Sequence, residues 1–250
     1  MVKRFLVSLV ALGAVVASMA GAEPAEAGGS TPVLIVGGLT EPQALLDTLQ
    51  GRLENAGLTV FTMGLPGAIP GTQDIALSAQ AVAARARQIL NQTGAAKLDV
   101  VGHSEGGLAL RYYIENLGGA AQVRRYVSLA TPQHGTQLAN IIGAFPIVGQ
   151  LAGALCTACA QMAVGSAFLA ALDSPTDVPG AVSYTALATR FDEAVIPAPQ
   201  ASFFRDGGTN ASVQQFCPND VVFHIGMLSD RAAAGLTISA LRGGPLTTAC

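Results

Sequence analysis

The stretch that most constrains this chain is Gly102-His-Ser-Glu-Gly106, because it follows directly on an apolar run that begins at Leu98. A buried strand that turns at once into a helix crowds its own backbone, so small residues are needed on both sides of the corner. Ser104 then stands on a strained turn with its hydroxyl exposed at the carboxyl edge of a sheet. We therefore predict that Ser104 is a nucleophile and that the backbone N–H of Glu105 faces the oxygen that becomes negative during attack on a carbonyl.

Apolar runs and helical stripes alternate along most of the chain. Helices are predicted where apolar residues recur at helical spacing, around Leu46 to Leu53, Ile75 to Ile89, Leu110 to Leu117 and Asp230 to Leu241. Strands are predicted over residues 32–36, 58–63, 98–101, 126–130, 183–189 and, as a short last strand, Ser212–Phe216. This alternation with short loops predicts an α/β protein, with a mainly parallel sheet and helices on both faces.

Length and composition suit one well-filled domain. The chain has 250 residues, of which 50% are apolar and 12% charged, and its formal net charge is −3. Since the basic residues form no cluster beyond Arg124 and Arg125, a nucleic-acid partner is not expected.

The N-terminus has the layout of a secretory signal. Lys3 and Arg4 precede an apolar run from Phe5 to about Ala20, and small-residue cleavage patterns follow. We expect residues 1–27 to be a signal peptide and 28–250 to form a single exported domain. The run is too short for a comfortable membrane span, so stable membrane insertion is not expected.

Four cysteines in an exported chain favour two structural disulfides over free thiols. Of the three possible pairings, we favour Cys156 with Cys159 and Cys217 with Cys250. The alternative for Cys156 and Cys159 is a redox or metal site, but no second pair has zinc-ligand spacing. We therefore expect no metal.

Residues 137–180 break the alternation. They contain long apolar or Ala/Gly-rich pieces, Ile141–Leu155 and Met162–Leu172, without an obvious strand. We predict that these pieces are helices of a small cap over the site, while ordinary core helices are the alternative.

The base for a serine nucleophile must be one of three histidines. His103 precedes Ser104 within a strand, so its side chain is expected on the opposite face. His134 follows the next strand and is expected to shape a loop wall. His224 lies before the closing helix, where the chain order nucleophile, acid, base places it. We predict that His224 is the base.

The acid should follow a strand between Ser104 and His224. Asp192 follows the strand predicted to end at Thr189, and Glu193 could replace it. Asp220 is a rival because it is near His224 in sequence. The remaining aspartates of this region are expected to be solvated in loops, namely Asp173, Asp177 and Asp206.

A second oxyanion donor should come from a backbone N–H just after the first strand. The paired glycines Gly37 and Gly38 mark a tight turn there. Leu39 is the preferred donor, ahead of Thr40.

These motifs together resemble small secreted microbial triacylglycerol lipases of the α/β-hydrolase fold, including the lipase-B-like group and the minimal bacterial lipases. The likeness runs from about Pro32 to Arg242. It rests on the Gly-Gly-Leu turn, Gly-His-Ser-Glu-Gly-Gly, Ala-Thr-Pro-Gln-His-Gly-Thr, Thr189-Arg-Phe-Asp-Glu193 and Phe223-His-Ile-Gly-Met-Leu228. The chain departs from many relatives at Gly37, where they have His, and at Glu105, where some have Met or Gln.

The resemblance implies Ser104, Asp192 and His224 as a triad, with the Leu39 and Glu105 amides as the oxyanion hole. We expect an exported monomer that hydrolyses acylglycerols or similar apolar esters without a cofactor and that also meets its substrate at a lipid–water interface. The alternatives are a non-lipolytic carboxylesterase, a cutinase-like polyester hydrolase and a catalytically inactive binding protein with this fold.

Overall fold

The computed structural model describes residues 31–139 and 155–250. Its six strands form one sheet in the order β2-β1-β3-β4-β5-β6, and every neighbouring pair is parallel. The strands are β1 (Val33–Val36), β2 (Val60–Met63), β3 (Leu98–His103), β4 (Val123–Leu129), β5 (Ser183–Ala188) and β6 (Thr209–Ser212). The prediction of an α/β protein with a mainly parallel sheet is confirmed.

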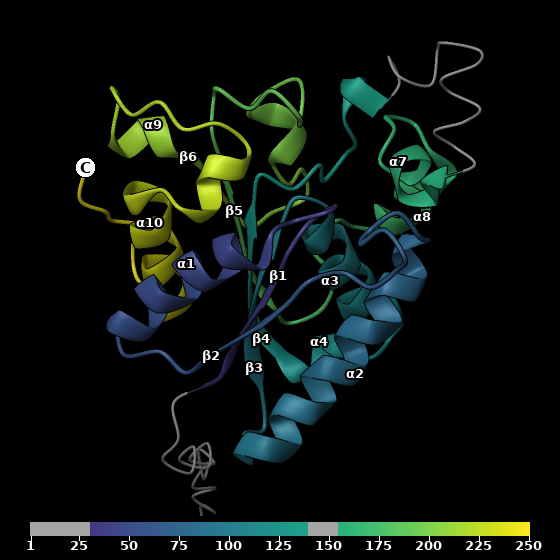
Figure 1. Cartoon of the computed structure of the whole chain (residues 1–250), viewed down its shortest axis with the longest axis horizontal. Helices are drawn as coiled ribbons and strands as arrows, with labels where there is room; N and C mark the ends of the chain where they lie inside the picture. The colour runs from purple at the N-terminus through teal and green to yellow at the C-terminus, as the bar shows by residue number, and fades with distance from the viewer. Residues whose placement is uncertain (1–30, 140–154) are drawn as a thin grey trace, which may run out of the picture.

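Helices cover both faces of the sheet (Figure 1). On one face α1 (Gln43–Asn55) and α10 (Arg231–Arg242) bury their apolar sides against the strands. On the other face lie α2 (Ile75–Thr93) and α3 (Glu105–Asn116). The sheet therefore separates two apolar cores, and β3 is buried along its whole length.

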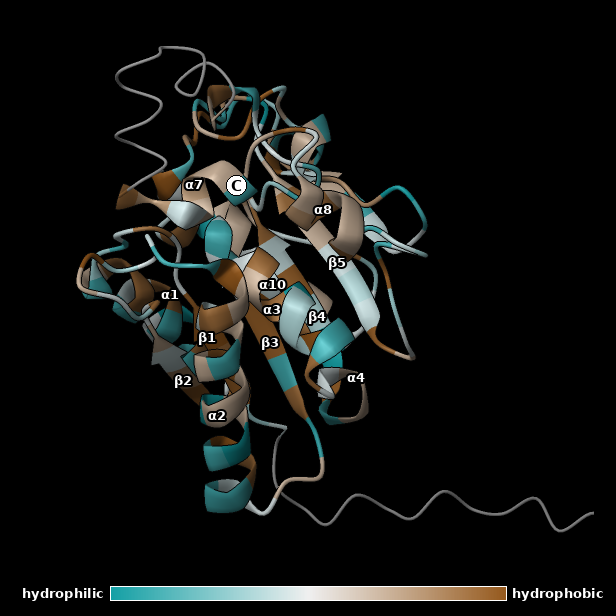
Figure 2. Ribbon diagram, turned by 90° about the vertical axis from the view of Figure 1, so that its right-hand side faces the viewer, coloured by the Kyte–Doolittle hydropathy of each residue, from teal (hydrophilic) through white to brown (hydrophobic). Residues whose placement is uncertain are grey.

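The amphipathic stripe of α2 explains its place in the fold. Ile75, Val82 and Ile89 are fully buried, and the C-terminal turns of the helix carry hydrophilic residues (Figure 2). The helix begins at Asp74, whose side chain accepts a hydrogen bond from an N–H of the first turn, and it ends at Gly94 in the left-handed conformation. Its length lets it span the sheet and bring its N-terminus to the carboxyl edge.

The strand predicted over Ser212–Phe216 is wrong. The strand β6 ends at Ser212, and Val213–Phe216 form the short helix α9. The backbone N–H of Ser212 donates to the Gln215 side chain (2.9 Å), and the Ser212 side chain accepts in return from the Gln215 backbone. This capping box starts a helix where apolar alternation suggested that the strand continues.

The predicted cap is described only in part. Its described helices are α7 (Thr157–Gln161) and α8 (Ala167–Leu172), beside the upper end of α2 in Figure 1. The run Met162–Leu172 is therefore helical only from Ala167. Almost all of the run Ile141–Leu155, like the predicted signal peptide over residues 1–27, lies outside the described residues.

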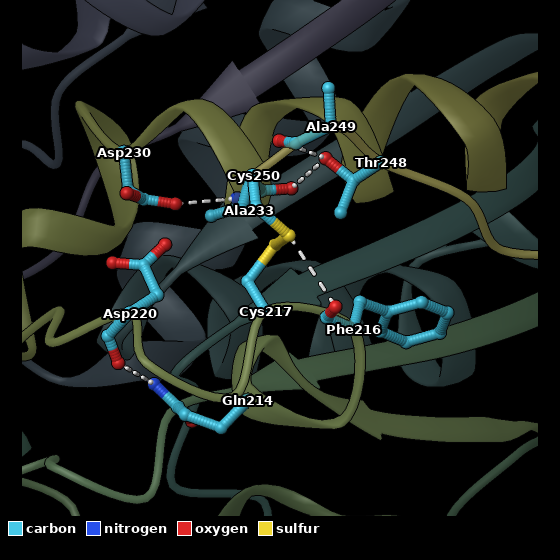
Figure 3. The surroundings of a disulfide bond; sticks show 10 residues. Gln214, Phe216, Cys217, Asp220, Asp230, Ala233, Thr248, Ala249 and Cys250 are labelled. Carbon is cyan, nitrogen blue, oxygen red and sulfur yellow. Dashed lines mark hydrogen bonds between the residues drawn. A yellow bond between two sulfur atoms is a disulfide. The ribbon is translucent and has the colours of Figure 1, made fainter.

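Both favoured disulfides are present. Cys156 pairs with Cys159, and Cys217 pairs with Cys250. The second bond ties the C-terminal segment to the loop after α9 (Figure 3).

The remaining described elements are short. They are the helix α4 (Gly119–Gln122) and two 3-10 turns, which cover Gln200–Ser202 and Ile225–Leu228. Over residues 31–139 and 155–250, none of the helices has both the length and the hydropathy needed to cross a membrane.

Candidate active site

Ser104 stands on a sharp corner between β3 and α3. Its backbone has φ 52° and ψ −128°, a region that residues with a side chain rarely adopt. The corner depends on glycine, because a Cβ atom on Gly106 would lie 2.3 Å from the carbonyl oxygen of Gly37. The strain and the close approach both fit the turn that the sequence predicts for Ser104.

The three side chains of the predicted triad meet at the carboxyl edge of the sheet. The Ser104 Oγ lies 2.9 Å from the Nε2 of His224, and the Nδ1 of His224 lies 2.9 Å from Oδ2 of Asp192. Since a carboxylate only accepts, Nδ1–H donates to Asp192, which leaves Nε2 to accept from the Ser104 hydroxyl. In this arrangement the Nε2 of His224 can take the proton of the Ser104 hydroxyl.

The acid is held firmly in this orientation. The other carboxylate oxygen of Asp192 accepts hydrogen bonds from the N–H groups of Ala194 (2.9 Å) and Val195 (2.7 Å). The rival Glu193 instead accepts from the backbone N–H of His224 (3.0 Å). The other rival, Asp220, lies beside Asp230 (Figure 3). Of the three, Asp192 is the one bonded to the imidazole.

The turn after β1 comes close to Ser104, and a Cβ on Gly38 would lie 2.8 Å from the Cβ of Ser104. In this turn the N–H of Thr40 donates to the carbonyl of Pro70 (2.9 Å). Among the described residues, no acceptor contacts the N–H of Leu39. Glu105 begins α3, where an N–H has no partner within the helix and the helix dipole favours negative charge. The two predicted oxyanion donors are thus available beside Ser104.

The side chain of Glu105 is fully buried. In the described part of the chain, neither of its carboxyl oxygens has a hydrogen-bond partner. A Cβ on Gly71 would lie 2.8 Å from one of these oxygens and 2.9 Å from the Cα of Leu39, so the carboxyl group lies beneath the oxyanion turn. Burial raises the pKa of Glu105 to about 8, so this acid is mainly neutral at pH 7.

A cavity of about 260 Å³ opens beside Ser104 and His224. Its walls are mostly apolar, and several come from the segment predicted to form the cap. They include Leu39, Leu138, Met162, Val195 and Ile225. Such walls suit an aliphatic group placed next to the hydroxyl.

The structure places His103 beside the site rather than on a separate face. Its ring centroid lies 4.8 Å from that of His224, and its Nε2 lies 3.1 Å from the backbone oxygen of His224. The Nδ1 of His103 contacts the carboxylate of Glu41. No sequence signal pointed to Glu41, since it lies in an irregular turn before Pro42 and belongs to no motif.

His134 belongs to a second buried cluster. Its Nδ1 lies 2.8 Å from Oδ2 of Asp173, and its Nε2 lies 3.1 Å from Oδ2 of Asp177. Arg111 donates to the other oxygen of Asp173 (2.8 Å). The expectation that Asp173 and Asp177 are solvated is wrong, because Asp177 is only 1% exposed and both carboxylates are paired. Asp206 is exposed, but its carboxylate accepts from the Asp177 N–H (2.9 Å).

Within the described ranges, no group of three or more His, Cys, Asp or Glu side chains is arranged to hold a metal ion. The chemistry that the residues at Ser104 can perform is nucleophilic attack with general-base assistance.

Solved structures share the fold. The chain is similar to Aspergillus fumigatus lipase B, with a TM-score of 0.71 and 21% identity over 88% of this chain and 54% of that one. It is also similar to a Bacillus licheniformis lipase in its mature form, with a TM-score of 0.64 and 19% identity over 82% of this chain and 89% of that one. The chain thus spans about half the length of the Aspergillus fumigatus protein. At these identities the likeness establishes the α/β-hydrolase fold.

The family model for palmitoyl protein thioesterase matches residues 32–213, which is most of the chain and includes the turn after β1, Ser104 and Asp192. His224 lies beyond the matched range, on the loop before α10. With this match over most of its length, the chain has the α/β-hydrolase fold and belongs to the palmitoyl protein thioesterase family.

Proposed function

We propose that this chain is a serine hydrolase that cleaves apolar acyl esters through an acyl-enzyme on Ser104. The single observation that carries the proposal is the continuous chain of contacts from Ser104 through His224 to Asp192, at 2.9 Å each, beside an apolar cavity.

In the first half-reaction, Ser104 Oγ bonds to the acyl carbon while Nε2 of His224 takes its proton. The carbonyl oxygen becomes negative and accepts from the N–H groups of Leu39 and Glu105. The bond to the alcohol then breaks, and His224 returns the proton to that alcohol. In the second half-reaction water bonds to the acyl carbon while Nε2 of His224 takes its proton. The bond to Ser104 Oγ then breaks, His224 returns the proton to Oγ, and the acid is released.

We propose acylglycerols as the main substrates. The support is the apolar cavity and the segment predicted as a cap over residues 137–180, whose described part contributes Leu138 and Met162 to the walls. Such walls stabilise an acyl chain more than a short acetyl group, because each buried CH₂ contributes about 0.8 kcal/mol.

Export is part of the proposal. Its support is the signal-like layout of residues 1–27 and the two disulfides, which persist in oxidising compartments. We propose a monomer whose substrate is presented at a lipid–water interface.

A long-chain thioester is the second candidate substrate, and the family match favours it. The acyl group and the acyl-enzyme would be the same, and only the leaving group would differ. A thiolate leaves without a proton more readily than an alkoxide does. Hydrolysis of a thioester therefore depends less on His224 as an acid.

The deciding experiment measures kcat/KM for p-nitrophenyl esters from acetyl to palmitoyl, for emulsified trioleoylglycerol and for palmitoyl-coenzyme A. The proposal expects hydrolysis of trioleoylglycerol and a rise in kcat/KM with chain length. Activity confined to acyl groups of about four carbons or fewer would favour the carboxylesterase alternative. A preference for palmitoyl-coenzyme A would favour the thioesterase. Failure of a fluorophosphonate to label Ser104 would favour the inactive binding protein.

A further inference from the structure

The base of the proposed mechanism is held by its backbone as well as by its ring. The carbonyl oxygen of His224 faces the Nε2 of His103 at 3.1 Å, and the N–H of His224 donates to Glu193 at 3.0 Å. Because a carbonyl only accepts, Nε2 of His103 carries a hydrogen. His103 therefore fixes the peptide group that follows the base.

His103 is fixed in turn by Glu41. The Oε2 of Glu41 contacts Nδ1 of His103 and also accepts from the N–H of Gly38 (3.1 Å). Burial raises the pKa of Glu41, but the hydrogen bond and charge of His103, together with the N–H of Gly38, outweigh it, and the pKa of Glu41 lies below its ordinary value. Glu41 is thus a carboxylate that binds two donors with one oxygen.

These contacts join three segments that are far apart in the sequence. Gly38 and Glu41 belong to the turn that holds the proposed donor Leu39, His103 immediately precedes Ser104, and His224 is on the loop before α10. Both side chains are almost inaccessible, with 1% exposed for His103 and 4% for Glu41.

Burying a carboxylate against an imidazole rarely adds stability compared with apolar residues of similar size, because both groups lose their hydration. Packing alone therefore explains the pair poorly. Its contacts are directed at the two features that must be correctly placed relative to Ser104, namely the oxyanion turn and the base.

We propose that Glu41 and His103 are positioning residues, which together set the distance between the oxyanion turn and His224. This inference rests on the proposed function. Neither side chain takes part in bond making. Loss of the link should leave substrate binding in place and slow the chemical step, because a displacement of about 1 Å in a reacting group costs up to roughly a hundredfold in rate.

Two conservative variants of His103 separate its two contacts. In His103→Gln, the amide nitrogen reaches the position of Nε2 and keeps a donor for the carbonyl of His224. In His103→Asn, the amide nitrogen takes the position of Nδ1, so the contact with Glu41 is kept and the one with His224 is lost. The two side chains are otherwise alike in polarity, so each is the matched control of the other.

We expect both variants to lower kcat with KM nearly unchanged, because each breaks one contact of the link, and His103→Asn to lower it more, by about tenfold or more, because it releases the base itself. Labelling of Ser104 by a fluorophosphonate should slow in parallel in His103→Asn. Melting temperatures, measured for both variants, show whether folding differs. A wild-type kcat per folded molecule in both variants would overturn the inference.

Glu41→Gln provides an independent test that does not depend on how the His103 variants fold. It should also lower kcat at unchanged KM, and combining it with His103→Asn should cost less than the product of the two single effects, because both break one linkage. Multiplicative effects would overturn the pairing. If the wild-type chain is neither labelled nor active, the proposed function fails. If the wild type is active and the variants are equally active, only the positioning role of Glu41 and His103 fails.

Discussion

Two buried histidines, His224 and His134, each contact an aspartate through Nδ1 but face different groups through Nε2. Each is 7% exposed, and each has its Nδ1 within 2.9 Å of an aspartate. The Nε2 of His224 faces the hydroxyl of Ser104, whereas the Nε2 of His134 faces a second carboxylate, that of Asp177. A carboxylate–imidazole pair is therefore no sign of catalysis by itself. The group on the other nitrogen decides what the pair can do.

The two carboxylates favour the protonated form of His134. Burial alone would lower the pKa of His134, but Asp173 and Asp177 outweigh it, and the pKa of His134 is raised. A protonated imidazole between two carboxylates has no lone pair to accept a proton, so it links structural elements. This cluster ties the loop after β4 to the end of α8 and, through Arg111, to α3.

The largest expected effect separates the two sites by activity. Asp192→Asn should lower kcat by a factor on the order of 10³ to 10⁴, because the tautomer of His224 that accepts from Ser104 is no longer favoured. The melting temperature and KM should change little. Steady-state kinetics on the purified variant, with circular dichroism to verify folding, provide the measurement.

Asp173→Asn is the matched control, since it makes the same change at the aspartate of His134, and its kcat should stay near that of the wild type. Asp220→Asn and Glu193→Gln test the two rivals for the acid. If Asp192→Asn keeps most of its activity, or if Asp220→Asn loses it, the assignment of the acid is wrong.

The second prediction separates the two sites by stability. His134→Gln should lower the free energy of unfolding by about 3 kcal/mol, because Asp177 is left buried without its cationic partner. His224→Gln should abolish activity and cost much less stability. Urea unfolding followed by circular dichroism measures both. Similar losses of stability in the two variants would contradict the prediction that His134 mainly stabilises the fold and His224 does not.

Much of the fold and of the candidate site follows from local sequence signals. The paired glycines around Ser104, the apolar runs and the helical stripes specify the parallel sheet, because each reflects backbone crowding or one-sided burial. Chain order then selects His224 and Asp192, which the structure brings together.

What the sequence did not reveal depends on contacts between distant segments. The link between Glu41 and His103 spans 62 positions and has no spacing rule. Asp177 looks like a loop aspartate, and its burial arises only when the loop after β4, which carries His134, and the segment before β6, whose Arg205 and Asp206 N–H groups donate to it, pack against the segment before β5. At Ser212 a local signal, the capping box with Gln215, was present and competed with the strand pattern.

A third buried group, the carboxyl of Glu105, differs from both histidines because it has no hydrogen-bond partner among the described residues. Because its pKa is about 8, activity should fall as the pH rises through that value, when a negative charge forms next to the oxyanion donors. Glu105→Gln should remove this alkaline loss and leave activity at pH 6 within a few-fold of the wild type. The pH profile of kcat for both proteins tests this, and an identical alkaline decline in the two would contradict it.

The smallest expected effect is the pH dependence of stability that His134 contributes. Its pKa in the folded state lies above the ordinary value of 6.5, so its stabilisation is fully present below that value and is lost as the pH rises through the folded pKa. Glu105 produces a decline over an overlapping range, since the unfolded chain releases this proton near 4.5 and the folded chain near 8. The contribution of His134 is therefore best isolated in the Glu105→Gln background. There, unfolding free energies measured from pH 5 to 9 should decline towards alkaline pH with His134 present and decline less after His134→Gln. Parallel curves for the two proteins would mean that His134 is neutral between its two aspartates, and the contrast with His224 would then rest on geometry alone.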